Sequence, residues 1–172
     1  YKEEIERALK TPGFSGFQLL DLHDFPGQGT ALVGLLDAFW DSKGIISAEN
    51  FRNFCSPVVP LTRFPKAVYT NNELFEATVE IANYSASDIK NRKISWNLLY
   101  SGGESVASGY FDVEQIEKGK NFVVGNISAS LDQIANATCL TLEVAVTGTA
   151  YKNNWPIWVY PENVVIDTGK VF

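Results

Sequence analysis

The feature that most constrains the fold of this chain is a change of hydrophobic periodicity near Pro57. Beyond it, apolar and polar residues alternate in short runs that are separated by turn signals such as Gly102-Gly103. Alternation with period two puts successive side chains on opposite faces of a strand, so each run predicts a strand with one buried face. The seven predicted strands cover residues 66–70, 74–84, 93–100, 105–113, 121–131, 139–149 and 155–160.

These closely spaced strands predict an immunoglobulin-like β-sandwich over residues 66–161. Trp96 is expected in its core, although the Cys…Trp…Cys pattern of antibody domains is absent. Cys55 and Cys139 lack metal or redox spacing. Two free thiols are the main interpretation, and a disulfide between them is the alternative.

Residues 1–56 carry a helical pattern instead, with apolar residues spaced three and four apart. The pattern predicts a helix over residues 2–10, a short buried strand over 14–22, a second helix over 32–40, and a third from Ser47 to Cys55. Three prolines predict an extended linker over residues 57–65, and residues 162–172 indicate the start of a further element. The expected fold is therefore mainly β, with a helix–strand–helix segment in front.

Composition and motifs exclude several functional classes. The formal net charge of −6 argues against nucleic-acid binding, because no basic surplus is available to neutralise phosphates. The longest apolar stretch, over residues 30–40, is too short for a membrane span, which needs about twenty residues. Metal-ligand clusters, calcium loops and phosphate-binding glycine loops are not found in the sequence, so neither a metal nor a cofactor is expected.

Residues 16–44, GFQLLDLHDFPGQGTALVGLLDAFWDSKG, resemble the closing segment of the (β/α)8 barrel in bacterial family 2 glycoside hydrolases, the β-galactosidase and β-glucuronidase relatives. Residues 51–57 resemble the junction to the β-sandwich that follows this barrel, and residues 155–161 resemble the end of that sandwich. The resemblance implies that residues 1–56 are the last part of the barrel. It also implies a bacterial protein that is periplasmic or secreted.

The resemblance implies a retaining enzyme with two catalytic carboxylates, at the ends of the fourth and seventh barrel strands. No residue of this chain matches either position, so no catalytic residue is assigned. The chain also contains no methionine, which agrees with a processed or excised piece of a longer protein. By itself it is expected to lack glycosidase activity.

Candidate substrate-binding residues follow the predicted strand over residues 14–22. Barrel enzymes bind their substrates at the carboxyl ends of the strands. Carboxylate, imidazole and amide groups there could hydrogen-bond carbohydrate hydroxyls in the parent enzyme. The candidates are Asp21, His23, Asp24 and Gln28. The alternative is a structural role, in which Asp24 caps the turn that follows and His23 lies on the surface.

Aromatic residues near the end of the sandwich are a second group of candidates. Planar rings can stack on sugars, and Trp155 and Trp158 are the residues proposed for this role. Strand alternation puts Trp158 and Tyr160 on one face and Trp155 on the other. Packing in the core or between domains is the alternative.

The sequence thus favours a structural C-terminal piece of a family-2-like glycoside hydrolase. Its expected partners are neighbouring domains of the same chain, and carbohydrate in the parent enzyme. The apolar face of residues 14–40 also predicts self-association if it is left uncovered. A carbohydrate-binding β-sandwich module and a cell-surface protein-interaction domain are the two alternatives.

Overall fold

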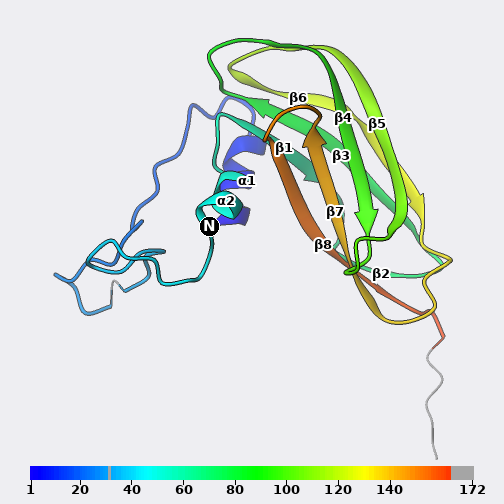
Figure 1. Cartoon of the computed structure of the whole chain (residues 1–172), viewed down its shortest axis with the longest axis horizontal. Helices are drawn as coiled ribbons and strands as arrows, with labels where there is room; N and C mark the ends of the chain where they lie inside the picture. The colour runs from blue at the N-terminus through cyan, green and yellow to red at the C-terminus, as the bar shows by residue number, and fades with distance from the viewer. Residues whose placement is uncertain (31, 164–172) are drawn as a thin grey trace, which may run out of the picture.

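The computed structural model describes residues 1–30 and 32–163 and shows a mainly β protein with two sheets and few helices (Figure 1). Each helix is short. The helices are α1 (Lys2–Lys10) and α2 (Ala48–Arg52). The strands are β1 (Val58–Arg63), β2 (Val68–Thr70), β3 (Leu74–Asn83), β4 (Ile89–Leu99), β5 (Ser105–Ile116), β6 (Lys120–Ser130), β7 (Thr138–Val146) and β8 (Lys152–Tyr160).

The strands form a three-stranded sheet, in the order β1-β3-β6, and a five-stranded sheet, in the order β2-β8-β7-β4-β5. Neighbouring strands are antiparallel, except that β2 runs parallel to β8. The two sheets form a β-sandwich. Each of the seven runs of alternating residues corresponds to one of the strands β2 to β8, so the prediction of a strand in each run is confirmed.

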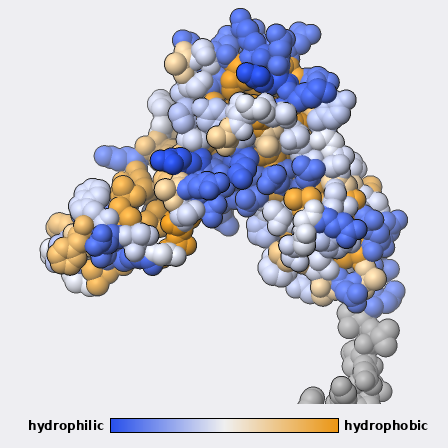
Figure 2. Space-filling model, in the orientation of Figure 1, coloured by the Kyte–Doolittle hydropathy of each residue, from blue (hydrophilic) through white to orange (hydrophobic). Residues whose placement is uncertain are grey.

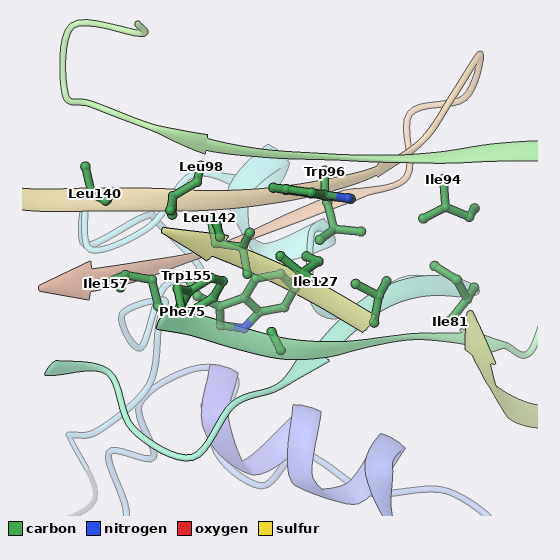
Figure 3. Packing of buried hydrophobic residues seen from close by; sticks show 14 of the residues in the cluster. Phe75, Ile81, Ile94, Trp96, Leu98, Ile127, Leu140, Leu142, Trp155 and Ile157 are labelled. Carbon is green, nitrogen blue, oxygen red and sulfur yellow. The ribbon is translucent and has the colours of Figure 1, made fainter. Parts of the chain in front are cut away.

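The core lies between the two sheets, where the inward side chains of β3, β4, β6, β7 and β8 interdigitate (Figure 3). Trp96 is buried there, as predicted, and its indole covers Gly109 on the neighbouring strand β5. A Cβ atom at position 109 would lie 2.8 Å from Nε1 of Trp96. Only glycine therefore fits beneath this ring.

Residues 58–63 form strand β1 rather than part of the expected linker. Pro60 lies opposite Ile81 of β3 in this pairing. β1 is an edge strand, and proline is tolerated at an edge because its missing N–H need not pair with a second neighbour. The prolines led to the prediction of an unpaired linker, whereas residues 58–63 pair with β3.

The helix predicted at residues 2–10 is confirmed as α1. Its Leu9 packs on Val59, Leu61 and Ala82, on the face of the three-stranded sheet opposite the main core. The short helix after Ser47 is also confirmed as α2, and the Ser47 Oγ accepts a hydrogen bond from the Asn50 backbone N–H at 3.1 Å.

The strand predicted over residues 14–22 and the helix predicted over 32–40 are wrong, because neither segment has regular secondary structure. Asp37 accepts hydrogen bonds from the backbone N–H groups of Phe39 and Asp41, at 2.8 and 2.9 Å. These side-chain bonds compete with helical ones and turn the chain. Residues 14–30 and 32–45, here called the arm, extend away from the sandwich (Figure 1).

Cys55 and Cys139 are free thiols, as the main interpretation predicted. Burial raises the pKa of the Cys55 thiol above its ordinary value. In the described ranges, 1–30 and 32–163, we find no helix that is long and apolar enough to cross a membrane. A further element was expected over residues 162–172. Residues 164–172 lie outside the described part of the chain, so this prediction is not tested.

Candidate functional site

Of the four candidate substrate-binding residues in the arm, three line the same pocket. Asp21, His23 and Gln28 surround a cavity of about 540 Å³ whose remaining lining is apolar. The apolar lining consists of Leu19, Leu20, Leu22 and Phe25. The structure thus brings these polar groups together, although the chain around them is an irregular loop and not the end of a regular strand.

Asp24, the fourth candidate, does not line this pocket but is buried inside the arm. Its carboxylate accepts hydrogen bonds from the Lys43 Nζ at 2.7 Å and from the Gly34 backbone N–H at 2.9 Å. The Lys43 hydrogen bond, helped by the one from Gly34, lowers the pKa of Asp24 below its ordinary value despite the opposing effect of burial. Asp24 therefore has a structural role, but it joins the two halves of the arm instead of capping the turn that follows it, as the alternative for this residue proposed.

His23 is held in one orientation by two contacts. Its Nδ1 lies 2.7 Å from the backbone carbonyl oxygen of Asp24, and its ring centroid lies 4.3 Å from that of Trp40. A carbonyl oxygen only accepts, so Nδ1 is the donor, and Nε2 of the neutral ring remains as an acceptor. The imidazole can therefore accept a hydrogen bond from a ligand.

Asp21 adds a second acceptor to the pocket, and Gln28 adds an amide that both donates and accepts. The backbone of Asp21 has a φ of 70°, in the left-handed region, and its carbonyl accepts a hydrogen bond from the Tyr1 hydroxyl at 3.2 Å. This donor and acceptor set suits an uncharged, hydroxylated ligand. Over the described part of the chain, we find no group of three His, Cys, Asp or Glu residues that could hold a metal ion.

The two candidate tryptophans lie on the sandwich and do not line the arm pocket. Trp155 is buried, and its indole Nε1 donates a hydrogen bond to Glu6 of α1 at 2.9 Å. Trp158 points to the opposite face of β8, where its side chain is partly exposed. Of the two, only Trp158 is open to a ligand.

A second cleft, of about 580 Å³, lies between the end of α1 and the three-stranded sheet, and the sequence pattern does not predict it. Buried Glu80 accepts hydrogen bonds there from Arg63 Nε and Asn121 Nδ2. Arg63 also donates to the backbone carbonyl of Lys10 at 2.6 Å. Alternation alone put Glu80 on a polar strand face, but its partners come from two other strands, and their pairing with β3 is not visible in the sequence.

A family model described as Domain of unknown function (DUF8488) matches residues 73–161, which hold strands β3 to β8. No curated protein matches the chain. Several solved structures are similar at low identity. The CARDB domain of the PF1109 protein from Pyrococcus furiosus, solved in complex with di-metal ions, is 12% identical with a TM-score of 0.46, over 61% of this chain and 94% of that chain.

Two glycoside hydrolases are also among the similar structures. A β-glucuronidase from glycoside hydrolase family 2 is 16% identical with a TM-score of 0.40, over 60% of this chain and 11% of that chain. A family 123 enzyme from Clostridium perfringens is 10% identical with a TM-score of 0.42, over 64% of this chain and 28% of that chain. The chain thus spans less than a third of the length of either hydrolase.

Proposed function

The chain belongs to the family described as Domain of unknown function (DUF8488), and we propose that it is a non-catalytic module of a carbohydrate-processing glycoside hydrolase. In this proposal the immunoglobulin-like sandwich is the scaffold, and the arm completes the neighbouring catalytic domain. The observation that supports the proposal is that the arm buries a polar cluster and exposes large apolar side chains.

The arm pairs a buried carboxylate internally and exposes most of its large apolar side chains. Asp24, Lys43 and Gly34 bond to one another inside it, whereas Leu20 is 81% exposed and Phe39 is 85% exposed. Figure 2 shows hydrophobic residues gathered on this part of the molecule. Apolar patches of this kind mark interaction sites. The other exposed apolar residues of the arm are Phe14, Phe17, Leu22, Phe25, Leu32, Val33, Trp40 and Ile45.

The sequence resemblance supports a catalytic barrel as the occupant of this surface. Residues 16–44 resemble the segment that closes the barrel of family 2 glycoside hydrolases. In a closed barrel, the apolar side chains of the arm would be covered by neighbouring strands and helices. Asp21, His23 and Gln28 would then hydrogen-bond the carbohydrate, while the catalytic carboxylates would come from the rest of the enzyme.

Hydrogen–deuterium exchange tests this assignment. We would compare the 172-residue chain with the product of its complete reading frame, and assay both on a panel of chromogenic glycosides. We expect backbone amides of residues 16–44 to be protected only in the longer protein, and only that protein to turn over a glycoside. Equal exchange in both proteins, or no turnover by the longer one, would contradict the proposal.

A pair of substitutions refines the test in the longer protein. Leu20→Ser with Phe39→Ser should lower its glycosidase activity, because both side chains would lose their contacts with the barrel. Tyr110→Ser, at an exposed aromatic on β5 of the sandwich, is the matched control and should leave activity unchanged. Equal activity in both variants would show that the arm does not complete the catalytic domain.

A further inference from the structure

We propose that the outer face of the five-stranded sheet binds a neutral polysaccharide chain on an aromatic platform. The platform consists of Trp158, Tyr160 and Val68, which lie side by side on β8 and β2. The arm is not part of it. This inference therefore does not depend on the function proposed for the arm.

The two rings of the platform project from the same face of one strand. Trp158 and Tyr160 are two residues apart, which places them about 7 Å apart along β8. Each is 44% exposed, and Val68, directly beside Trp158 in the parallel pairing, is 54% exposed. These side chains form a continuous apolar strip across two strands.

The platform is rigid because the opposite face of β8 is fixed in the core. Ile157 and Val159 alternate with the two rings and are fully buried. The Trp158 backbone N–H donates to the Ala67 carbonyl at 2.8 Å, and the Asn71 N–H donates to the Tyr160 carbonyl at 2.9 Å. A ligand would find the strand already ordered, so the entropic cost of binding is reduced.

The surroundings of the rings favour an uncharged ligand. The cross-strand neighbours of Trp158 are Val68 and Cys139, and the neighbour of Tyr160 on β2 is Thr70. Pro156 and Thr141, the next outward pair, are also uncharged. The charged residues beside the platform, Lys66 and Glu73, form an ion pair, and Glu73 also accepts a hydrogen bond from the Thr70 hydroxyl. Their charges are thus matched within the chain, and the aromatic faces of the platform suit the faces of sugar rings.

The shape and size of the platform favour an extended polymer. The rings lie on an open sheet face and not in either cleft described above, whereas small ligands are usually enclosed in concave pockets. Two aromatic side chains of about 150–250 Å² each, both 44% exposed, offer roughly 200 Å² of ring surface. A stable protein–protein interface needs about 800 Å² per partner, so the rings alone are too small an area for a protein partner.

Sedimentation with insoluble polysaccharide and affinity gel electrophoresis test the proposal on the 172-residue chain. The probes are neutral polymers (cellulose, mixed-linkage β-glucan, xylan and starch), with heparin as an anionic comparison. We expect binding to at least one neutral polymer and none to heparin. Trp158→Ala and Tyr160→Ala should each weaken binding at least about tenfold, as removal of a central aromatic contact usually does.

Two variants serve as controls: Tyr110→Ala, at an exposed aromatic on β5, and Phe39→Ala, at an exposed aromatic on the arm that does not line the arm pocket. Both should bind like the unsubstituted chain, and all four variants should melt at similar temperatures. The proposal would be overturned if no neutral polymer bound, or if the Trp158 and Tyr160 variants bound normally. It would also be overturned if Trp158→Ala abolished self-association in sedimentation velocity, which would assign the platform to a second copy of the chain.

Discussion

The indole Nε1 of Trp155 donates a hydrogen bond to the carboxylate of Glu6, which lies 2.9 Å away and 149 positions earlier in the chain. The side-chain amide of Asn153 donates to the same carboxylate at 2.8 Å, and Lys10 donates to it at 3.4 Å. Glu6 is buried, so water does not replace these contacts. The Glu6 carboxylate therefore links α1, which precedes the arm in the chain, to β8.

Glu6→Ala should therefore destabilise the protein. It leaves the Trp155 indole without its buried acceptor and removes one of the two hydrogen bonds that the Asn153 side-chain nitrogen donates, and such a loss costs about 1–3 kcal/mol. Urea unfolding followed by tryptophan fluorescence measures the change. Glu3→Ala is the control, because the Glu3 side chain is 84% exposed. Equal unfolding midpoints for the two variants would show that the contact does not hold α1 in place.

Gly109→Ala should destabilise the sandwich by overpacking it. The added methyl group would lie 2.8 Å from Nε1 and 2.9 Å from Cε2 of Trp96, so the indole or the strand has to move. Changes of this kind cost about 1–3 kcal/mol. Urea unfolding measures the loss, and near-ultraviolet circular dichroism reports any movement of the ring. Gly102→Ala, where a Cβ would meet nothing within 4 Å, should unfold like the unsubstituted chain.

The internal order of the arm should depend on pH through Asp24. The Lys43 hydrogen bond lowers the pKa of this carboxyl below its ordinary value of 3.8, so ionised Asp24 stabilises the folded arm. This stabilisation is complete above the ordinary pKa and is lost as pH falls through the lowered one. Nuclear magnetic resonance of the Gly34 amide should show the loss in that acidic range.

Lys43→Met should move this transition upward, toward the ordinary pKa of an aspartate, because the largest cause of the shift is removed. Asp41→Asn, at an exposed carboxylate of the same arm, is the matched control and should leave the transition where it is. A transition that does not respond to Lys43→Met would assign the acid sensitivity to another group.

The uncovered arm should make the isolated chain associate as its concentration rises. Leu20→Ser with Phe39→Ser should weaken this association, because both removed side chains are largely exposed. The free energy of unfolding should change little, within about 0.5 kcal/mol for each exposed position. Sedimentation velocity over a range of concentrations measures the effect, with Val123→Ser on β6 as an exposed control. A chain that stays monomeric at every concentration would contradict this prediction.

The sequence predicted the sandwich well, because most of the length of strands β2 to β8 has one buried and one more exposed side and therefore an alternating pattern; the second half of β3 is an exception, since it is buried on both faces. β1 escaped prediction for the opposite reason. α1 covers its outer face and the core covers its inner face, so Val58–Leu61 has no alternation to detect. The arm was mispredicted because its apolar spacing fits a helix that the Asp37 side chain interrupts.

The candidate site was predictable in part. Asp21, His23 and Gln28 were recognisable as a polar group within an apolar segment, and they line one pocket. The hydrogen-bond partners of Asp24 and Trp155 were not predictable, because each partner is distant in sequence. The Asp24 carboxylate accepts a hydrogen bond from Lys43, and the Trp155 indole donates a hydrogen bond to Glu6 of α1.

Tension applied between residues 67 and 161 would load the pairing of β2 with β8 in shear. The two strands are parallel, so pulling the start of one away from the end of the other slides them past each other. The bonds at Trp158 N–H and Asn71 N–H would then bear the force together, instead of opening one after another. For tension between residues 67 and 161, the parallel pairing of β2 with β8 therefore resists extension better than an unzipping geometry would.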